Sequence, residues 1–243
     1  MKDLRFGWGV LVAWAVAALV AIAFVEQWVE LPDRWNPWAP LWPYDPPTVL
    51  TSYKLSRLNG DARACARALA ATTLASAPLQ DRALSNGCGW SNAVRVTGLP
   101  SRVAPPVVLS CPAAVSLAMW ERHALQPAAA AMLGDRVVAV EHFGGYACRN
   151  ISGGAPGEQE GGANLSEHAS ANALDVAAFV LSDGRTVSVA RDWQRPSDDP
   201  RRRFLKAVHD GACDLWNVVL GPDYNAAHRD HFHLDLGRSR ACR

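Results

Sequence analysis

The sequence has almost no excess of charge of either sign. Its 24 lysines and arginines are balanced by 23 aspartates and glutamates, which leaves a formal net charge of +1. Proteins that bind nucleic acids usually carry a strongly basic surface. The charge balance therefore predicts no nucleic-acid partner, and the absence of internal repeats gives no sign of a repeat architecture.

Closely spaced cysteine pairs are also absent. No two of the six cysteines have the spacing C-x-x-C, which argues against a zinc cage made of cysteine alone and against a thioredoxin-like motif. An even number of cysteines favours three disulfides, which are typical of an oxidising compartment. The sequence does not fix the pairing, although the loop after the first cysteine favours a local Cys65–Cys88 bond. The other four are Cys111, Cys148, Cys213 and Cys242.

Charge is missing altogether from residues 6–25. About 20 apolar residues in a helix are enough to cross a bilayer. Lys2 and Arg5 precede this run and acidic residues follow it, so the positive-inside rule leaves the N-terminus in the cytoplasm. We therefore expect an uncleaved signal anchor within residues 1–30 and an exported remainder, with a cleaved signal peptide as the alternative.

Residues 31–50 are rich in proline and tryptophan, a composition that favours extended backbone over helix. Two interpretations stay open for this segment: a semi-rigid stalk, or an irregular arm packed on the following domain. Of the whole sequence, 49% is apolar and 19% charged, which is typical of a globular protein. The sequence thus predicts a globular domain over residues 51–243.

Within this domain, apolar spacing predicts helices over 61–74, from residue 111 to Pro127, and from Pro200 to about Gly221. Residues 136–143 are rich in β-formers, and the Asp183-Gly184 turn between 173–181 and 186–190 predicts a hairpin. The glycine-rich residues 151–163 are expected to form a mobile loop. Asp175 is then on a strand, and His168 is on the connection that leads into it.

A stretch near the C-terminus has an alternating pattern that predicts a strand. His231, His233 and Asp235 share one face, while the other face is apolar. Two imidazoles and a carboxylate one pleat apart are costly to bury unless a metal or a hydrogen-bond network satisfies them. The apolar face consists of Phe232, Leu234 and Leu236.

We expect this strand to form a catalytic zinc site together with His168 and Asp175. His168, Asp175 and His233 provide two imidazoles and a carboxylate and leave a fourth position for water. His231 is the favoured general base, because it faces the same side as His233, with Asp230 as the competing candidate. We expect Asp235 to orient an imidazole from behind the ligands. His228 is set aside as structural or solvated.

The motifs around these residues resemble known families. Ser166-x-His168-x6-Asp175 followed by Asp230-His231-x-His233 resembles the metal-binding pattern of the D-Ala-D-Ala metallopeptidase, lysostaphin and hedgehog superfamily. A longer series, over roughly residues 61–243, resembles the bacterial extensin-like C-terminal domain family. This series comprises Cys148-Arg149, 165–169, 172–175, 183–185, 220–222 and 225–236.

The resemblance implies an α+β fold, with a small antiparallel sheet flanked by helices, and Zn²⁺ held by the three ligands above. It also implies that Arg149 binds substrate or stabilises an oxyanion, as the arginine of a Tyr-Arg pair does in the D-Ala-D-Ala peptidases, and it places Ser166 with substrate binding. Those peptidases typically have Glu-x-x-His where this chain has Asp230-x-x-His233. The identity of the base therefore stays open.

Together these features predict a zinc peptidase anchored in the bacterial inner membrane through residues 6–25, with its C-terminal domain in the periplasm. Peptidoglycan is the partner that the bacterial family implies, and the reaction is hydrolysis of amide bonds in its stem peptides or crosslinks. The alternative is a cell-wall binding or scaffolding module that holds zinc only for structure.

Overall fold

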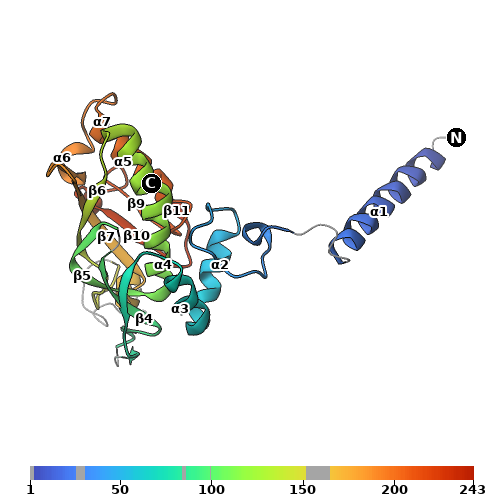
Figure 1. Ribbon diagram of the computed structural model, residues 1–243, viewed down its shortest axis with the longest axis horizontal. Coiled ribbons are helices and arrows are strands. Elements are labelled where there is room, and N and C mark those ends of the chain that lie inside the picture. Colours follow the sequence, from blue (N-terminus) through green and yellow to red (C-terminus); the bar gives the residue numbers. More distant parts are fainter. Residues whose placement is uncertain (1–2, 26–30, 84–85, 99, 152–164) are drawn as a thin grey trace.

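The computed structural model describes residues 3–25, 31–83, 86–98, 100–151 and 165–243. Figure 1 shows a body in which helices lie against one large sheet, with α1 drawn apart from it. The helices are α1 (Asp3–Val25), α2 (Thr51–Arg57), α3 (Ala62–Ala70), α4 (Cys111–Trp120), α5 (Gln126–Leu133), α6 (Val189–Asp192) and α7 (Pro200–Ala212). The 3-10 turns are η1 (Asp33–Trp35), η2 (Leu58–Gly60), η4 (Glu167–Ser170) and η5 (Ala226–His228), and η3 (Glu121–Leu125) is π-helical.

The described strands form one large sheet and one small one. They are β1 (Ala75–Pro78), β2 (Arg82–Ala83), β3 (Gly89–Trp90), β4 (Ala93–Gly98), β5 (Arg102–Ser110), β6 (Val137–Gly144), β7 (Ala173–Leu181), β8 (Thr186–Ser188), β9 (Val218–Leu220), β10 (Phe232–Asp235) and β11 (Ala241–Cys242). Nine of them make a sheet in the order β1-β4-β5-β6-β7-β10-β9-β11, with β8 also paired to β7. β2 and β3 form a separate hairpin.

The expected small antiparallel sheet is wrong, because the sheet is large and mixed. β5 runs parallel to β6, and β11 runs parallel to β9. Parallel neighbours need a long crossover connection, and α4, η3 and α5 provide it between β5 and β6. Ser110 starts that crossover, since its side chain accepts a hydrogen bond from the Ala113 amide, 3.3 Å away, and so caps α4.

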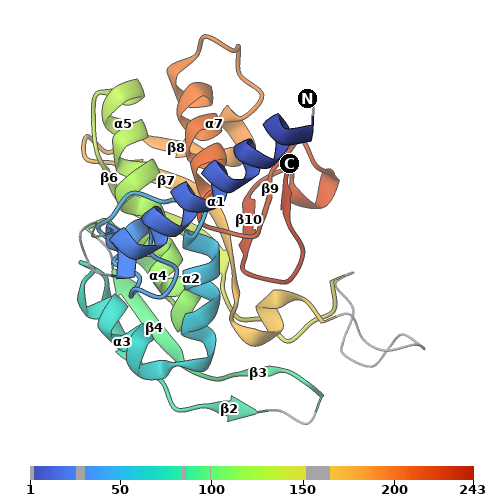
Figure 2. The ribbon, with the colours of Figure 1, turned by 90° about the vertical axis from the view of Figure 1, so that its right-hand side faces the viewer.

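The main core lies between the sheet and the helices. Trp120 of α4 and Phe204 of α7 approach Phe179 of β7, with ring centroids 5.9 and 5.2 Å from it. Figure 2 looks onto this helical side and shows the β2–β3 hairpin at the lower edge of the body. Phe232 and Leu234 of β10 are fully buried in the same core, which confirms the apolar face predicted for that strand.

The proline- and tryptophan-rich segment packs on the domain, which supports the second of the two interpretations. Lys54 of α2 is buried and donates hydrogen bonds to the carbonyl oxygens of Asp33, at 2.6 Å, and Pro40, at 3.3 Å. His123 lies 2.9 Å from the carbonyl oxygen of Pro43, and Leu41 is buried. Backbone carbonyls of this segment are thus paired with side chains of the domain.

The predicted transmembrane segment needs a correction. Within the described ranges, no helix, α1 included, is long and apolar enough to cross a membrane. A span takes about 20 consecutive apolar residues. The expectations of a transmembrane helix over residues 6–25 and of a single-pass inner-membrane protein are therefore contradicted.

All six cysteines are paired, as predicted, but not in the favoured way. The bonds join Cys65 to Cys111, Cys88 to Cys148, and Cys213 to Cys242. The Cys65–Cys88 prediction is wrong because α3 packs against the start of α4, which places Cys65 beside residue 111 instead.

Other local predictions are confirmed in part. The hairpin around Asp183-Gly184 forms between β7 and β8, but helix α6 begins already at Val189. The helix predicted to reach Gly221 ends at Ala212, and the apolar residues that follow form β9, which pairs with β10. The glycine-rich loop predicted for 151–163 lies, beyond its first residue, outside the described residues.

Candidate metal centre

The centre is built on two paired strands. β7 and β10 run antiparallel, and their register places Asp175 directly opposite His233. Because side chains alternate along a strand, both residues point away from the face that carries Phe232 and Leu234. The register of β6 against β7 shifts close by, between Glu141 and His142. Such bulges are frequent beside functional sites.

His168 reaches the same place from the short turn η4. The Ser166 hydroxyl accepts a hydrogen bond from the His168 amide, at 3.3 Å, and caps the turn. The ring is buried, and its Nδ1 donates to the carbonyl oxygen of Gly145 at 2.9 Å. Gly145 packs so closely on β5 that a Cβ there would lie 2.5 Å from the Val108 carbonyl oxygen. This hydrogen bond leaves Nε2 of His168 free of a proton in the neutral ring.

The three predicted ligand atoms converge. Nε2 of His168 lies 3.2 Å from Nδ1 of His233 and 3.1 Å from Oδ1 of Asp175, and the last two atoms are 2.9 Å apart. Tetrahedral zinc with bonds of about 2.0–2.1 Å places its ligand atoms roughly 3.3 Å apart. Two histidines and one carboxylate are a donor set found in zinc enzymes. The residues present therefore fit zinc, although binding itself stays a prediction.

The second nitrogen of His233 is held as the sequence suggested. Nε2 of His233 lies 2.9 Å from Oδ2 of Asp235, and the other Asp235 oxygen accepts from the Gly237 amide at 2.8 Å. Because a carboxylate can only accept, Nε2 carries the proton and Nδ1 faces the other ligands. A carboxylate behind a ligating histidine fixes its tautomer and orientation. Asp235 thus has the geometry of the predicted supporting residue.

The electrostatics of this cluster favour positive charge. Burial raises the pKa of Asp175, but the close contacts with His168 and His233 outweigh burial and hold that pKa well below its usual range. Burial lowers the pKa of His233, whereas hydrogen bonds to Asp175 and Asp235 outweigh it and raise the pKa to about 9. Without a metal ion, a proton on His233 therefore offsets part of the negative charge of Asp175 and Asp235. A metal ion would replace that proton.

His231 and Asp230, the two candidates for the base, form a pair. Nδ1 of His231 lies 2.9 Å from Oδ1 of Asp230, so this nitrogen donates and Nε2 keeps its lone pair. Nε2 points toward the ligands and lies 3.6 Å from Oδ1 of Asp175. The Asp230 side chain is 37% exposed and has no such approach of its own in the described contacts. The geometry favours His231 as the proton acceptor, with Asp230 orienting it.

Arg149 and Ser166 have different positions at the centre. One terminal nitrogen of Arg149 lies 3.9 Å from Oδ2 of Asp175, and the Arg149 side chain is 36% exposed. The guanidinium thus borders the ligands while staying open to solvent. Ser166 is only 7% exposed and its hydroxyl accepts from the backbone of η4. Ser166 has a structural role here, and its predicted role in substrate binding stays untested.

His228 is the residue that the sequence argument set aside. Its ring centroid lies 5.3 Å from that of His231 and 5.8 Å from that of His233. Burial, together with the two neighbouring imidazoles, lowers the pKa of His228 to about 4. It is therefore a neutral ring at the edge of the centre. The spacing His228-x-x-His231-x-His233 could have identified this residue from the sequence. No local pattern predicted the 3-10 turn η5, which brings His228 to the centre.

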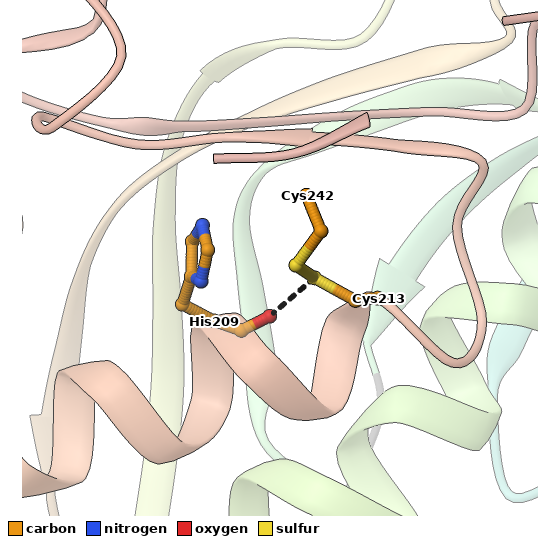
Figure 3. Close-up of side chains that lie close together, drawn as sticks. All are labelled: His209, Cys213 and Cys242. Carbon is orange, nitrogen blue, oxygen red and sulfur yellow. Dashed lines mark hydrogen bonds between the residues drawn. A yellow bond between two sulfur atoms is a disulfide. The ribbon is translucent and has the colours of Figure 1, made fainter. Parts of the chain in front are cut away.

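A second cluster of metal-binding residue types lies elsewhere in the fold. His209, Cys213 and Cys242 have ligand atoms within 4.8 Å of one another. Figure 3 shows that the two sulfur atoms are joined to each other. The Sγ atom of Cys213 lies 3.5 Å from the His209 carbonyl oxygen. Zinc binds thiolates, not disulfide sulfurs. This cluster is a structural crosslink and does not fit a metal.

Comparison with known proteins gives one match. The family model described as "Extensin-like protein C-terminus" matches residues 63–243, well over half of the chain. No curated protein and no solved structure matches. The matched segment contains His168, Asp175 and His233, and also the surrounding residues Arg149, Asp230, His231 and Asp235.

Proposed function

We propose, from the premise that this chain belongs to the extensin-like C-terminal family, that it is a zinc-dependent hydrolase of amide bonds in peptidoglycan peptides. The single observation that carries the proposal is the convergence of three ligand atoms at separations of 2.9 to 3.2 Å. The likeness of its motifs to the D-Ala-D-Ala metallopeptidase pattern adds support for amide hydrolysis. The three disulfides suit a protein that works in oxidising surroundings.

His168, Asp175 and His233 would hold the zinc ion. When bound, zinc activates water and polarises the scissile carbonyl. Nε2 of His231 accepts a proton from the attacking water as the new C–O bond forms, and the imidazolium then returns the proton to the leaving nitrogen as the C–N bond breaks. Asp230 keeps Nδ1 of His231 protonated and stabilises the imidazolium, as a carboxylate does behind a catalytic histidine.

Arg149 has a separate task in this proposal. Its guanidinium is partly exposed beside Asp175 and offers several N–H donors in one plane. Such a group suits either a substrate carboxylate or the oxyanion that develops on the attacked carbonyl. Either contact orients the amide with its carbonyl carbon toward the ligands.

A non-catalytic cell-wall module is the second candidate. A purely structural zinc site needs four closed ligands and no base, whereas here three ligands converge and His231 aims an unprotonated nitrogen at them. This observation favours the hydrolase.

The test is digestion of purified peptidoglycan sacculi by the full chain, with soluble products identified by mass spectrometry. We expect new amino and carboxyl termini in the peptide stems, complete loss of products with a chelator, and recovery on adding zinc. Stoichiometric zinc and sacculus binding with no cleavage products would instead establish the cell-wall module.

A further inference from the structure

A large pocket shares the turn η4 with the metal centre and has no part in the chemistry described above. It has a volume of about 850 Å³, which falls in the range of roughly 300–1,000 Å³ that is usual for ligand sites. The β2–β3 hairpin, with Arg82 and Trp90, forms one wall, and η4, with Glu167 and Ser170, forms another. Asp81 and Gly60 lie on the same lining.

The strand β3 of this wall is anchored to the domain by a disulfide and by contacts of Trp90. Its two strands are only two residues long and would not be stable alone. The disulfide from Cys88 to Cys148 ties the hairpin to the segment that also carries Arg149. Trp90 donates to the Gln80 carbonyl oxygen at 3.1 Å, and its ring meets that of Tyr146 edge-on, with centroids 4.8 Å apart. The pocket therefore has a preformed wall, as ligand sites usually do.

The chemistry of the lining suits a neutral ring with many hydroxyl and amide groups. Trp90 lines the pocket with an aromatic ring, and the Arg82 guanidinium lies over that ring, 5.3 Å from its centroid, so a ligand meets the two side chains together. Asn172 also lines the pocket, and it donates to a Glu167 oxygen at 2.8 Å. The positive charge of Arg82 is offset by Asp81 and Glu167, so a strongly charged ligand is not favoured. Aromatic surfaces beside planar hydrogen-bonding groups fit a sugar ring.

The pocket and the metal centre both include residues of the 3-10 turn η4. Glu167 and Ser170 line the pocket, and His168 stands on the same 3-10 turn. Glu167 also borders Gly237, where a Cβ would lie 2.7 Å from its Oε1, and the Gly237 amide donates to Asp235 behind His233. A ligand in the pocket would thus contact the same turn that positions His168.

We propose that this pocket binds a sugar unit of the peptidoglycan glycan strand while the attached peptide reaches the metal centre. The inference rests on the proposed function and deepens it, because it makes the substrate a peptide that is still joined to its glycan. Peptides released from the glycan would then be cleaved less efficiently than intact strands.

Isothermal titration calorimetry of the full chain with chitotetraose, a soluble oligomer of N-acetylglucosamine, tests the pocket. Trp90→Ala should weaken binding at least about five-fold through loss of the ring surface. Gly60→Tyr should weaken it as much, because a Cβ at Gly60 meets nothing within 4 Å and the new ring projects into open space on the lining. Trp38→Ala removes a tryptophan that is 79% exposed and lines a different pocket, and should change nothing.

Thermal melting of each variant separates binding from folding. If Trp90→Ala melts early, Gly60→Tyr decides the matter alone. No heat from the wild-type chain, or wild-type affinity in Gly60→Tyr, would overturn the inference.

A zinc-ligand variant keeps this inference distinguishable from the proposed function. His168→Ala should lose sacculus cleavage and still bind chitotetraose. If the wild-type chain binds the oligomer but cleaves nothing, the pocket stands and the hydrolase falls. If it cleaves sacculi but does not bind the oligomer, only the pocket falls.

Discussion

Among the residues that the structure describes, two clusters bring histidine together with other metal-binding residue types. They differ in whether their donor atoms are already bonded to other groups. In the first, one ring nitrogen each of His168 and His233 and one oxygen of Asp175 lie within 3.2 Å of one another and are free to bind a metal ion once His233 loses its proton. In the second, Cys213 and Cys242 are bonded to each other. Proximity alone is therefore a poor criterion for a metal site.

The hydrogen bonds of the histidine rings also distinguish the two clusters. Each histidine of the first cluster has its outward nitrogen bound to a fixed acceptor, namely the Gly145 carbonyl for His168 and Asp235 for His233. His209 has both ring nitrogens occupied, one by Asp210 at 3.0 Å and one by the Arg243 carbonyl oxygen at 3.1 Å. His209 therefore has no free ring nitrogen that could bind a metal ion. The second cluster serves as a structural crosslink.

The largest expected effect comes from removing one histidine of each cluster. His233→Ala should abolish zinc binding, measured by metal analysis after dialysis, because two ligands no longer hold the ion. His209→Ala should keep one zinc per chain and lower the melting temperature, because the buried ring packs between Trp193 and Phe232. Zinc loss in His209→Ala, or a second zinc in the oxidised wild-type chain, would contradict the comparison.

The next effect concerns the base, which only the first cluster has. His231→Ala should lower the rate of sacculus cleavage by about 10²–10⁴-fold, because proton transfer then falls to water. Zinc content should stay at the wild-type value, since His231 is not among the three ligands. Asp230→Ala is the matched variant and should cost less, because it removes only the carboxylate that orients His231. A larger loss in Asp230→Ala than in His231→Ala would make Asp230 the base instead.

The site was easier to predict from the sequence than the sheet around it. Alternation along residues 231–236 fixed which side chains of β10 face the core, because the strand is short, regular and has one apolar face. His168 and Asp175 were found because their residue types and spacing have few structural uses. What stayed hidden was the Gly145 carbonyl, since a backbone acceptor leaves no mark in the sequence.

The sheet was underestimated because much of it depends on distant partners. β1 and β11 are short, and β5 contains Pro105 and Pro106, which weaken any strand pattern. Their pairing is set by contacts that local sequence does not reveal. The same reason explains the disulfide error, since Cys65 pairs across helices with Cys111 and not with the next cysteine along the chain.

The disulfide of the second cluster should matter for stability and not for zinc. The Cys213→Ser, Cys242→Ser double variant opens a loop of 29 residues, which is expected to cost about 3.5 kcal/mol of unfolding free energy in the chain-entropy account. Denaturant unfolding measures this loss. Zinc content should not change, because β9 and β10 remain paired without the bond. A chain that lost its zinc together with the bond would tie the two clusters into one unit.

The smallest expected effect distinguishes Asp235 from Asp210, which are the carboxylates hydrogen-bonded to a histidine of the first and of the second cluster. Asp235→Asn should weaken zinc binding by about 10–100-fold, because the amide no longer fixes the tautomer of His233 and can present an N–H to Nε2 instead of an acceptor. Asp210→Asn makes the same change beside His209, at an exposed carboxylate, and should leave zinc affinity as it was. Competition with a chromophoric chelator measures both. Equal affinities in the two variants would mean that Asp235 only fills space, and the distinction drawn between the clusters would then rest on the disulfide alone.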